Sequence, residues 1–146
     1  MDRWEFWEDL MDVRKIMTTN VECIAPETTI QDAARKMKSL DVGFLPICEN
    51  DRLLGTVTDR DIVLRALADG KDCNTVARDV MTSQVFFCFD DETIDGCANH
   101  MKEHEVKRLL VLNRDKRLVG VVSLGDLSKH KEKAAGQTLK DISDAA

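Results

Sequence analysis

Two short stretches carry polar residues that could bind a ligand, and the spacing of these residues is the same in both. GTVTDRD returns later in the chain as GVVSLGD, and in each copy a hydroxyl residue precedes an aspartate by three positions: Thr58 with Asp61, and Ser123 with Asp126. A hydroxyl at a helix N-cap and a carboxylate at N3 form a capping box, so one interpretation is structural. The same carboxylate can accept hydrogen bonds from two adjacent sugar hydroxyls, with the Thr or Ser hydroxyl as a third contact. We interpret these four residues as candidate ribose-binding residues, with helix capping as the alternative.

A nucleotide would also need cations and an apolar slot. Arg60 and the adjacent pair Lys107 and Arg108 are candidate phosphate-binding residues, and the alternative is that they are solvated surface cations. An adenine ring needs apolar walls with backbone hydrogen bonds, and the alternative for such residues is ordinary core. The candidate adenine slot consists of Ile24, Ala25, Phe44, Leu45 and Pro46.

The two copies are not equivalent. Gly55 and Gly120 are the first residues of the two copies and lie within predicted strands. A glycine at such a position indicates that another segment passes close to the backbone. The segment TDRD has become SLGD, which removes the arginine, and Phe89 stands where the first half has Ala25. We therefore expect two unequal sites, with the better one at Thr58 and Asp61.

The similarity between the halves extends well beyond this phrase. KIMTTNV matches DVMTSQV, TTIQDAARKM matches ETIDGCANHM, DVGFLPI matches EVKRLLV, and RLLGTVTDRDI matches RLVGVVSLGDL. The offset is nearly constant, which indicates a structural duplication. Two copies are too few for a solenoid, so the halves are expected to pack as a pseudo-twofold pair.

Each half shows the pattern β-α-β-β-α. Apolar residues recur at i, i+3, i+4 and i+7 in the first helix of each half, at Ile30, Ala33, Ala34 and Met37 in one copy and Ile94, Cys97, Ala98 and Met101 in the other. Thr28 and Gln31 are expected to cap the first helix. The last helix of each half is expected to begin at Thr58 or Ser123, and the first of these to end near Gly70. The predicted strands span residues 21–24, 44–48 and 53–57, then 85–89, 109–112 and 118–122.

The order of elements and the repeated G-x-x-[ST]-x-x-D motif resemble the CBS domain. Two in tandem resemble the CBS pair, or Bateman module, over roughly residues 13–130, and the sequence is most similar to small stand-alone bacterial CBS-pair proteins of the hypoxic-response type. The resemblance implies an α/β (α+β) fold of two tandem repeats. It also implies a regulatory protein, not an enzyme, that binds AMP, ADP, ATP or S-adenosylmethionine in clefts between the repeats. Homodimers are common in this family, and its small members act in stress responses.

Composition excludes several other classes. The net charge is −6, which argues against a nucleic-acid surface. No apolar run approaches the length that crosses a membrane, and the N-terminus lacks a signal-peptide pattern, so a cytoplasmic location and no membrane partner are expected. No known catalytic motif occurs. A protein partner is expected but not identified by the sequence. An alternative is therefore a structural or partner-binding module with vestigial clefts.

The five cysteines include no CxxC pair, so neither a disulfide framework nor a metal site is expected. Cys23 and Cys48 end neighbouring predicted strands, which leaves open a redox-responsive disulfide as well as two reduced thiols. His104 and His130 are too few for a zinc site within one chain unless a dimer adds ligands, and surface histidines are the simpler interpretation.

Four segments are predicted along the chain. Residues 1–12 form an amphipathic helix with Trp4, Trp7 and Met11 on one face, which docks on the core or on a second copy. Residues 13–72 form the first CBS domain and residues 73–130 the second. Residues 131–146 form a polar tail, with a short helix at 138–142 or fraying.

Overall fold

The computed structural model describes residues 11–132, which form two compact units. The first-repeat unit comprises residues 22–85. The second-repeat unit combines residues 86–132 with the segment 11–21, although this segment precedes the first repeat in the chain. The segment 11–21 therefore packs with the second repeat, although the first repeat follows it directly in the sequence. The predicted helix at residues 1–12, apart from its last two residues, and the predicted tail helix at 138–142 lie outside the described part.

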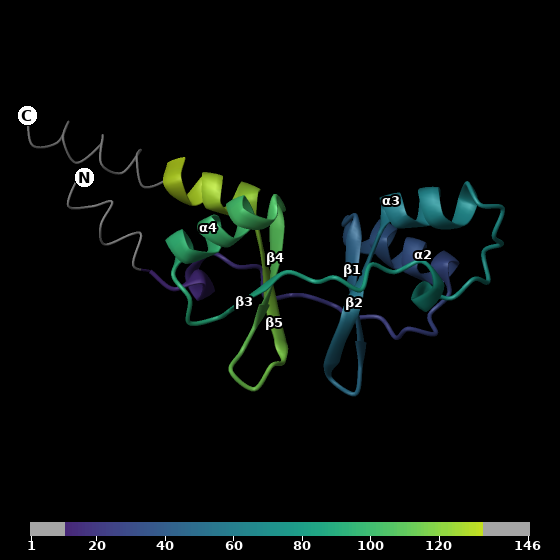
Figure 1. Ribbon diagram of the computed structural model, residues 1–146, viewed down its shortest axis with the longest axis horizontal. Helices are drawn as coiled ribbons and strands as arrows, with labels where there is room; N and C mark the ends of the chain where they lie inside the picture. The colour runs from purple at the N-terminus through teal and green to yellow at the C-terminus, as the bar shows by residue number, and fades with distance from the viewer. Residues whose placement is uncertain (1–10, 133–146) are drawn as a thin grey trace, which may run out of the picture. The chain divides into compact units, whose positions relative to one another are not determined.

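The first-repeat unit is a two-stranded antiparallel hairpin with helices on one side (Figure 1). The hairpin closes through Asn50 and Asp51, both with positive φ, the conformation of a tight two-residue turn. Of the predicted strand at 21–24 only one bridge forms, a parallel one between Ile24 and Ile47. The elements are α2 (Ile30–Leu40), β1 (Phe44–Glu49), β2 (Arg52–Thr58), α3 (Asp59–Asp61), η2 (Ile62–Leu67) and η3 (Ala77–Asp79).

Helix α2 begins one residue later than the sequence predicts. Thr29, not Thr28, is the N-cap, and its hydroxyl accepts a hydrogen bond from the Asp32 backbone N–H at 3.2 Å. The predicted capping box at Thr28 is therefore wrong, because the Ile30 N–H bonds to the Thr75 carbonyl at 2.8 Å and fixes where the helix starts. Ala34 is exposed, so the buried face of α2 is a narrower stripe than predicted.

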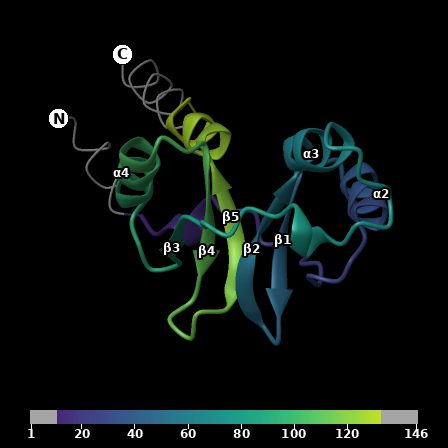
Figure 2. The ribbon, with the colours of Figure 1, turned by 45° about the vertical axis from the view of Figure 1, so that its right-hand side comes forward.

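The core of the first-repeat unit lies between the hairpin and its helices (Figure 2). It contains Ile30, Ala33 and Met37 from α2, with Ala66 from η2 against strand residues. Helix α3 runs directly into η2, a π-helical segment in which the Ala68 N–H bonds to the carbonyl of Val63 five residues earlier. The segment ends before Gly70, as predicted, where a φ of 74° favours glycine.

Three strands form the sheet of the second-repeat unit, in the order β3-β4-β5. β3 is parallel to β4, and β4 is antiparallel to β5. The predicted strand at 85–89 is confirmed from Phe87 onward. The elements are η1 (Val13–Lys15), β3 (Phe87–Phe89), α4 (Ile94–His104), β4 (Arg108–Leu112) and β5 (Leu118–Ser123), followed by a helix described over residues 124–132.

The helices of this unit also cover one face of their sheet (Figure 1). Ile94, Cys97 and Met101 of α4 pack with Leu127 of the following helix, as the helical spacing predicts. Val13 from the N-terminal segment is buried in the same cluster. Both repeats thus give mixed helix-and-strand units, the predicted fold class. No helix in residues 11–132 is long and apolar enough to cross a membrane.

Candidate functional site

Both copies of the repeated motif form complete capping boxes. The Thr58 hydroxyl accepts a hydrogen bond from the Asp61 N–H, and the Thr58 N–H donates to Asp61 Oδ2, both at 3.0 Å. Ser123 and Asp126 repeat this arrangement at 3.1 and 2.9 Å. The structural interpretation of the motif is therefore confirmed, and it holds each aspartate in one orientation at the end of a strand.

The capping box occupies one oxygen of Asp61 and leaves the other in longer contacts. Oδ1 lies 3.5 Å from the Thr82 hydroxyl and 3.7 Å from Arg65 Nε. Both distances exceed those of a good hydrogen bond. The side chain is only 12% exposed, so Oδ1 is a fixed acceptor with spare capacity for a hydroxyl group.

The glycines of the motif accommodate a crossing segment, as the sequence predicts. A Cβ on Gly55 would lie 2.5 Å from the Thr82 carbonyl oxygen, and Thr82 pairs with Thr56 through two backbone hydrogen bonds of 2.8 and 3.0 Å. A Cβ on Gly120 would lie 2.9 Å from the Thr18 carbonyl oxygen, and Thr18 pairs likewise with Val121. Each glycine therefore brings a threonine of the segment before the repeat to the motif.

Two further candidates lie beside the capping residues. Phe44 is the cross-strand partner of Thr58 in the hairpin, and Arg108 is the partner of Ser123 in the other sheet. The residues before them also correspond, because the carbonyl of Lys107 accepts from the Leu124 N–H at 2.7 Å, as Gly43 does from Asp59. The same position beside the motif thus carries an aromatic ring in one unit and cations in the other.

The remaining adenine-slot residues are less favourable. Ile24 and Leu45 are buried in the core of the first-repeat unit, as the alternative interpretation predicts. The Ile24 N–H donates to the Pro46 carbonyl at 2.9 Å, so these two backbone groups already satisfy each other. Ala25 is exposed. Of the predicted slot, the half-buried Phe44 is the member closest in register to Thr58.

The predicted cations are all exposed. Arg60 follows Asp59, whose side chain accepts from the Arg60 backbone N–H at 2.8 Å, and the guanidinium of Arg60 makes no ion pair with any residue from 11 to 132. Sequence reasoning missed Arg65 and Thr82, which contact Asp61. Arg65 was recognisable as the i+4 partner of Asp61 on one helix, whereas Thr82 required knowledge of the strand crossing.

The first cysteine pair is close in space. Cys23 and Cys48 Sγ atoms lie 2.9 Å apart, with Cys23 exposed. The hydrogen bond from the Cys48 thiol lowers the pKa of Cys23, while the same contact and then burial raise the pKa of Cys48. One sulfur is thus favoured as a thiolate and the other as a thiol.

The predicted histidine pair lies in the second-repeat unit. His104, at the end of α4, stacks on Phe86 at a centroid distance of 4.5 Å, and His130 lies on the helix described over residues 124–132.

Comparison with known proteins agrees with this organisation. Hypoxic response protein 1 of Mycobacterium tuberculosis is 39% identical over 132 residues, which cover 88% of this chain and 92% of the relative. A crystal structure of Hypoxic Response Protein I with two coordinated zinc ions matches with a TM-score of 0.73 at 38% identity, covering 82% of this chain and 98% of that one. The CBS domain pair of protein MJ0100, in complex with 5′-methylthioadenosine and S-adenosyl-L-methionine, matches with a TM-score of 0.72 at 26% identity, covering 82% of this chain and 94% of that one.

The family model for the CBS domain matches twice. The matches cover residues 13–67 and 77–133, one for each repeat. Together with the two units and their repeated capping boxes, these matches show that the chain belongs to the CBS-domain family, as a pair of CBS domains.

Proposed function

We propose that this protein is a regulatory sensor that binds an adenosine-containing ligand, such as AMP, ADP, ATP or S-adenosylmethionine. The observation that carries the proposal is the geometry of Asp61. Its Oδ2 is fixed by the helix cap, and its Oδ1 is a nearly buried acceptor with only long contacts. A ribose diol has the donor pair that such an acceptor binds.

The neighbouring residues support this assignment. Thr58 adds a hydroxyl beside the carboxylate, and Phe44, its cross-strand partner, is the proposed wall for the base. Arg60, one residue from Asp61, is the cation for a phosphate or carboxylate group of the ligand. The CBS domain pair of MJ0100, crystallised with 5′-methylthioadenosine and S-adenosyl-L-methionine, supports the class of ligand.

The second-repeat unit carries a weaker version of the same site. Ser123 and Asp126 replace Thr58 and Asp61, and Lys107 and Arg108 supply cations beside the strand instead of an aromatic wall. We propose that this site favours ligands with more negative charge, because it offers two cations and no ring at that position.

The test is isothermal titration of AMP, ADP, ATP, S-adenosylmethionine and 5′-methylthioadenosine into the wild type and Asp61→Asn. The asparagine oxygen can still accept from the Thr58 N–H, so the cap survives, but an NH₂ group replaces the free oxygen and cannot accept from a ribose hydroxyl. We expect Asp61→Asn to weaken binding of the preferred ligand at least tenfold. Asp126→Asn makes the same test of the second site.

Asp32→Asn is the matched control. Asp32 is also at N3 of a capped helix, but it is exposed and lies outside the motif. Its substitution is expected to leave affinity unchanged. A ligand that binds wild type and Asp61→Asn equally would overturn the ribose assignment. Absence of binding by any adenosyl compound to folded protein would favour the structural or partner-binding module instead.

A second candidate function is redox response through Cys23 and Cys48. The 2.9 Å separation of the sulfur atoms favours it. With a small disulfide such as oxidised glutathione as the oxidant, the Cys23 thiolate attacks one sulfur and releases one glutathione thiolate. Cys48 then loses its proton, attacks Cys23 Sγ in the mixed disulfide and releases the second glutathione. The two protein thiols are oxidised, and the glutathione disulfide is reduced to two thiols.

Intact-mass measurement after treatment with oxidised glutathione tests this function. The wild type is expected to lose two hydrogen masses, whereas Cys48→Ser is expected to stop at the mixed disulfide on Cys23. Cys73→Ser serves as the control, because Cys73 is exposed and takes no part in the pair. Stable glutathione adducts on wild-type Cys23 would show that the pair does not close.

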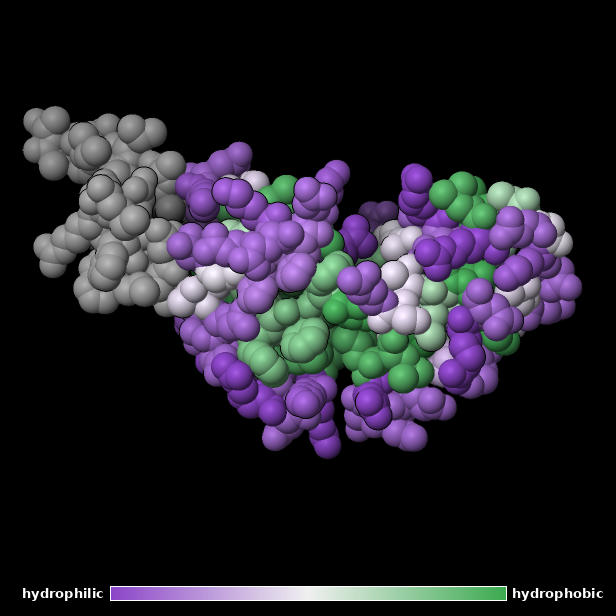
Figure 3. All heavy atoms as spheres, in the orientation of Figure 1, coloured by the Kyte–Doolittle hydropathy of each residue, from purple (hydrophilic) through white to green (hydrophobic). Residues whose placement is uncertain are grey.

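We also propose that the protein is a homodimer. Three apolar side chains of η2, Val63, Leu64 and Leu67, are 50, 47 and 71% exposed, and apolar surface is visible where Figure 1 draws this helix (Figure 3). Exposed apolar clusters mark interaction sites. Light scattering after gel filtration tests the proposal: wild type is expected at twice the monomer mass and Leu67→Glu at the monomer mass. A monomeric wild type would refute it.

A further inference from the structure

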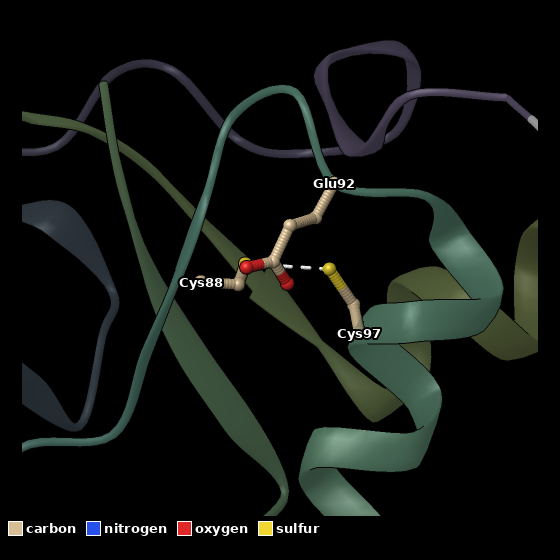
Figure 4. Close-up of side chains that lie close together, drawn as sticks. All are labelled: Cys88, Glu92 and Cys97. Atoms are coloured by element: carbon tan, nitrogen blue, oxygen red, sulfur yellow. Dashed lines mark hydrogen bonds between the residues drawn. The ribbon is translucent and has the colours of Figure 1, made fainter. Parts of the chain in front are cut away.

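The second-repeat unit brings together three side chains that typically ligate transition metals. Cys88 lies on β3, Cys97 on α4, and Glu92 in the loop that joins them (Figure 4). The two Sγ atoms are 3.3 Å apart, and a carboxylate oxygen of Glu92 lies with them in a cluster whose donor atoms are all within 4.8 Å of one another. Figure 4 shows the Glu92 side chain reaching from its loop toward both sulfur atoms.

Local structure fixes all three positions. Cys88 pairs in parallel register with Val111, which turns its side chain into the core of the unit. The Thr93 hydroxyl caps α4 by accepting from the Gly96 N–H at 3.0 Å, so Cys97 falls on the first buried turn. Glu92 is anchored through its backbone, because its N–H donates to the Phe89 carbonyl and its carbonyl accepts from the Val13 N–H. The cluster therefore needs no rearrangement of the chain to form.

Two buried cysteines alone would be ordinary core residues. Cys88 and Cys97 are 1% and 0% exposed, which fits that interpretation. The carboxylate directed at them is not part of that core: Glu92 is partly exposed and its Oε2 lies 3.3 Å from His100 Nε2, so a charged oxygen borders the two thiols.

We propose that Cys88, Glu92 and Cys97 form a binding site for a zinc-class divalent cation. Two thiolates and a carboxylate are a ligand set that Zn²⁺ accepts, and three protein ligands leave a fourth position for water. With metal–sulfur bonds of about 2.3 Å, tetrahedral geometry needs sulfur atoms about 3.8 Å apart. The observed 3.3 Å requires them to part by about half an ångström, which small side-chain rotations provide.

His100 completes the surroundings of the site as an orienting residue. Its Nε2 lies 3.3 Å from Oε2 of Glu92, one turn along α4 from Cys97. Carboxylates that ligate metal ions are commonly held in turn by such an outer hydrogen-bonding group. The Glu92 side chain is 26% exposed, so a cation can reach the buried sulfur atoms from the carboxylate side. On binding, both thiols release a proton and the cation links β3 to α4.

Cobalt(II) is the probe that tests the site. Titration of reduced, metal-free protein with Co²⁺ is expected to produce sulfur-to-metal charge-transfer absorption in the near ultraviolet and to saturate at one equivalent. Zn²⁺ is expected to abolish this absorption by displacing cobalt. The second group of possible ligands, His100, Glu103 and His104 on the exposed face of α4, contains no sulfur and cannot give this band.

Three variants locate the bound ion. Cys88→Val and Cys97→Ala keep apolar residues that suit a strand and a helix, and each is expected to remove the charge-transfer band. Glu92→Gln keeps the size of the side chain and is expected to weaken zinc binding at least tenfold while the band persists at high cobalt. The control is a protein with Cys23, Cys48 and Cys73 all changed to Ser, which is expected to keep the full band.

Several results would overturn the proposal. One is a reduced wild type, folded by circular dichroism, that shows no sulfur-to-cobalt band at millimolar cobalt. Another is a band that persists in Cys88→Val and disappears in the triple-serine control, which would place binding at the other cysteines. A third is mass spectrometry of the reduced preparation that shows Cys88 and Cys97 still joined as a disulfide, because no thiol would then be available for a metal.

Discussion

Substitution of Gly55 by alanine tests whether the repeated motif depends on the strand crossing. The added methyl group would lie 2.5 Å from the Thr82 carbonyl oxygen, whereas ordinary contact begins at 3.4 Å, so the segment has to move by about 0.9 Å. That displacement breaks both backbone hydrogen bonds between Thr56 and Thr82, now 3.0 and 2.8 Å long. At about 0.5–1.5 kcal/mol for each bond, we expect a loss of about 1–3 kcal/mol in the free energy of unfolding.

Urea denaturation with thermal melting measures the loss. For a chain of this size the expected decrease in melting temperature is roughly 3–10 °C. Gly125→Ala is the matched control, because it adds the same methyl group on a helix where the nearest atom, Ser123 Oγ, is 3.5 Å away. The control is expected to be neutral or to gain about 0.5–1 kcal/mol, as alanine does over glycine in helices. Equal stability of Gly55→Ala and Gly125→Ala would refute the close-approach argument.

Two further predictions concern the first-repeat unit. Thr29→Ala is expected to lower the free energy of unfolding by about 1 kcal/mol because it removes the N-cap of α2, whereas Thr28→Ala is expected to change it by less than about 0.5 kcal/mol; urea melts that rank them in reverse would contradict the assigned cap. The lowered pKa of Cys23 means that its thiolate persists to lower pH than an ordinary thiol. The midpoint pH for iodoacetamide modification of Cys23 is therefore expected to lie below that of an ordinary cysteine and to shift upward in Cys48→Ala, which removes the hydrogen-bond donor; an unchanged midpoint in Cys48→Ala would contradict the hydrogen-bond argument.

Local patterns predicted most of the elements that position the motif. The hairpins, the buried stripe of each first helix and both capping boxes follow from short-range spacing, because periodicity and cap chemistry act within a few residues. The same spacing misplaced the first cap by one residue, since Thr28 and Thr29 are chemically equal and only long-range contacts, such as the bond from Ile30 to Thr75, distinguish them.

The sequence did not predict which distant segments pair with each other. The segments KIMTTNV and DVMTSQV resemble each other, so either one fits beside either motif by its local pattern. Their true partners depend on backbone hydrogen bonds that join distant parts of the chain, such as Thr18 with Val121. The cluster of Cys88, Glu92 and Cys97 was not predicted for a related reason. It combines residues of a strand, a loop and a helix, and no known ligand-spacing motif in the sequence indicates such a site.

The packing of segment 11–21 with the second repeat also affects the order in which the chain can fold during synthesis. The first-repeat unit is continuous, so all of its residues have been synthesised once Val85 is added. Residues 11–21 emerge earlier than any of these, yet their partners on β5 are translated more than 90 residues later, since Thr18 pairs with Val121. Segment 11–21 is thus synthesised before the first-repeat unit but pairs with its strand only after β5 has been made. A circularly permuted gene that begins at residue 22 and carries segment 11–21 after the second repeat would remove that wait.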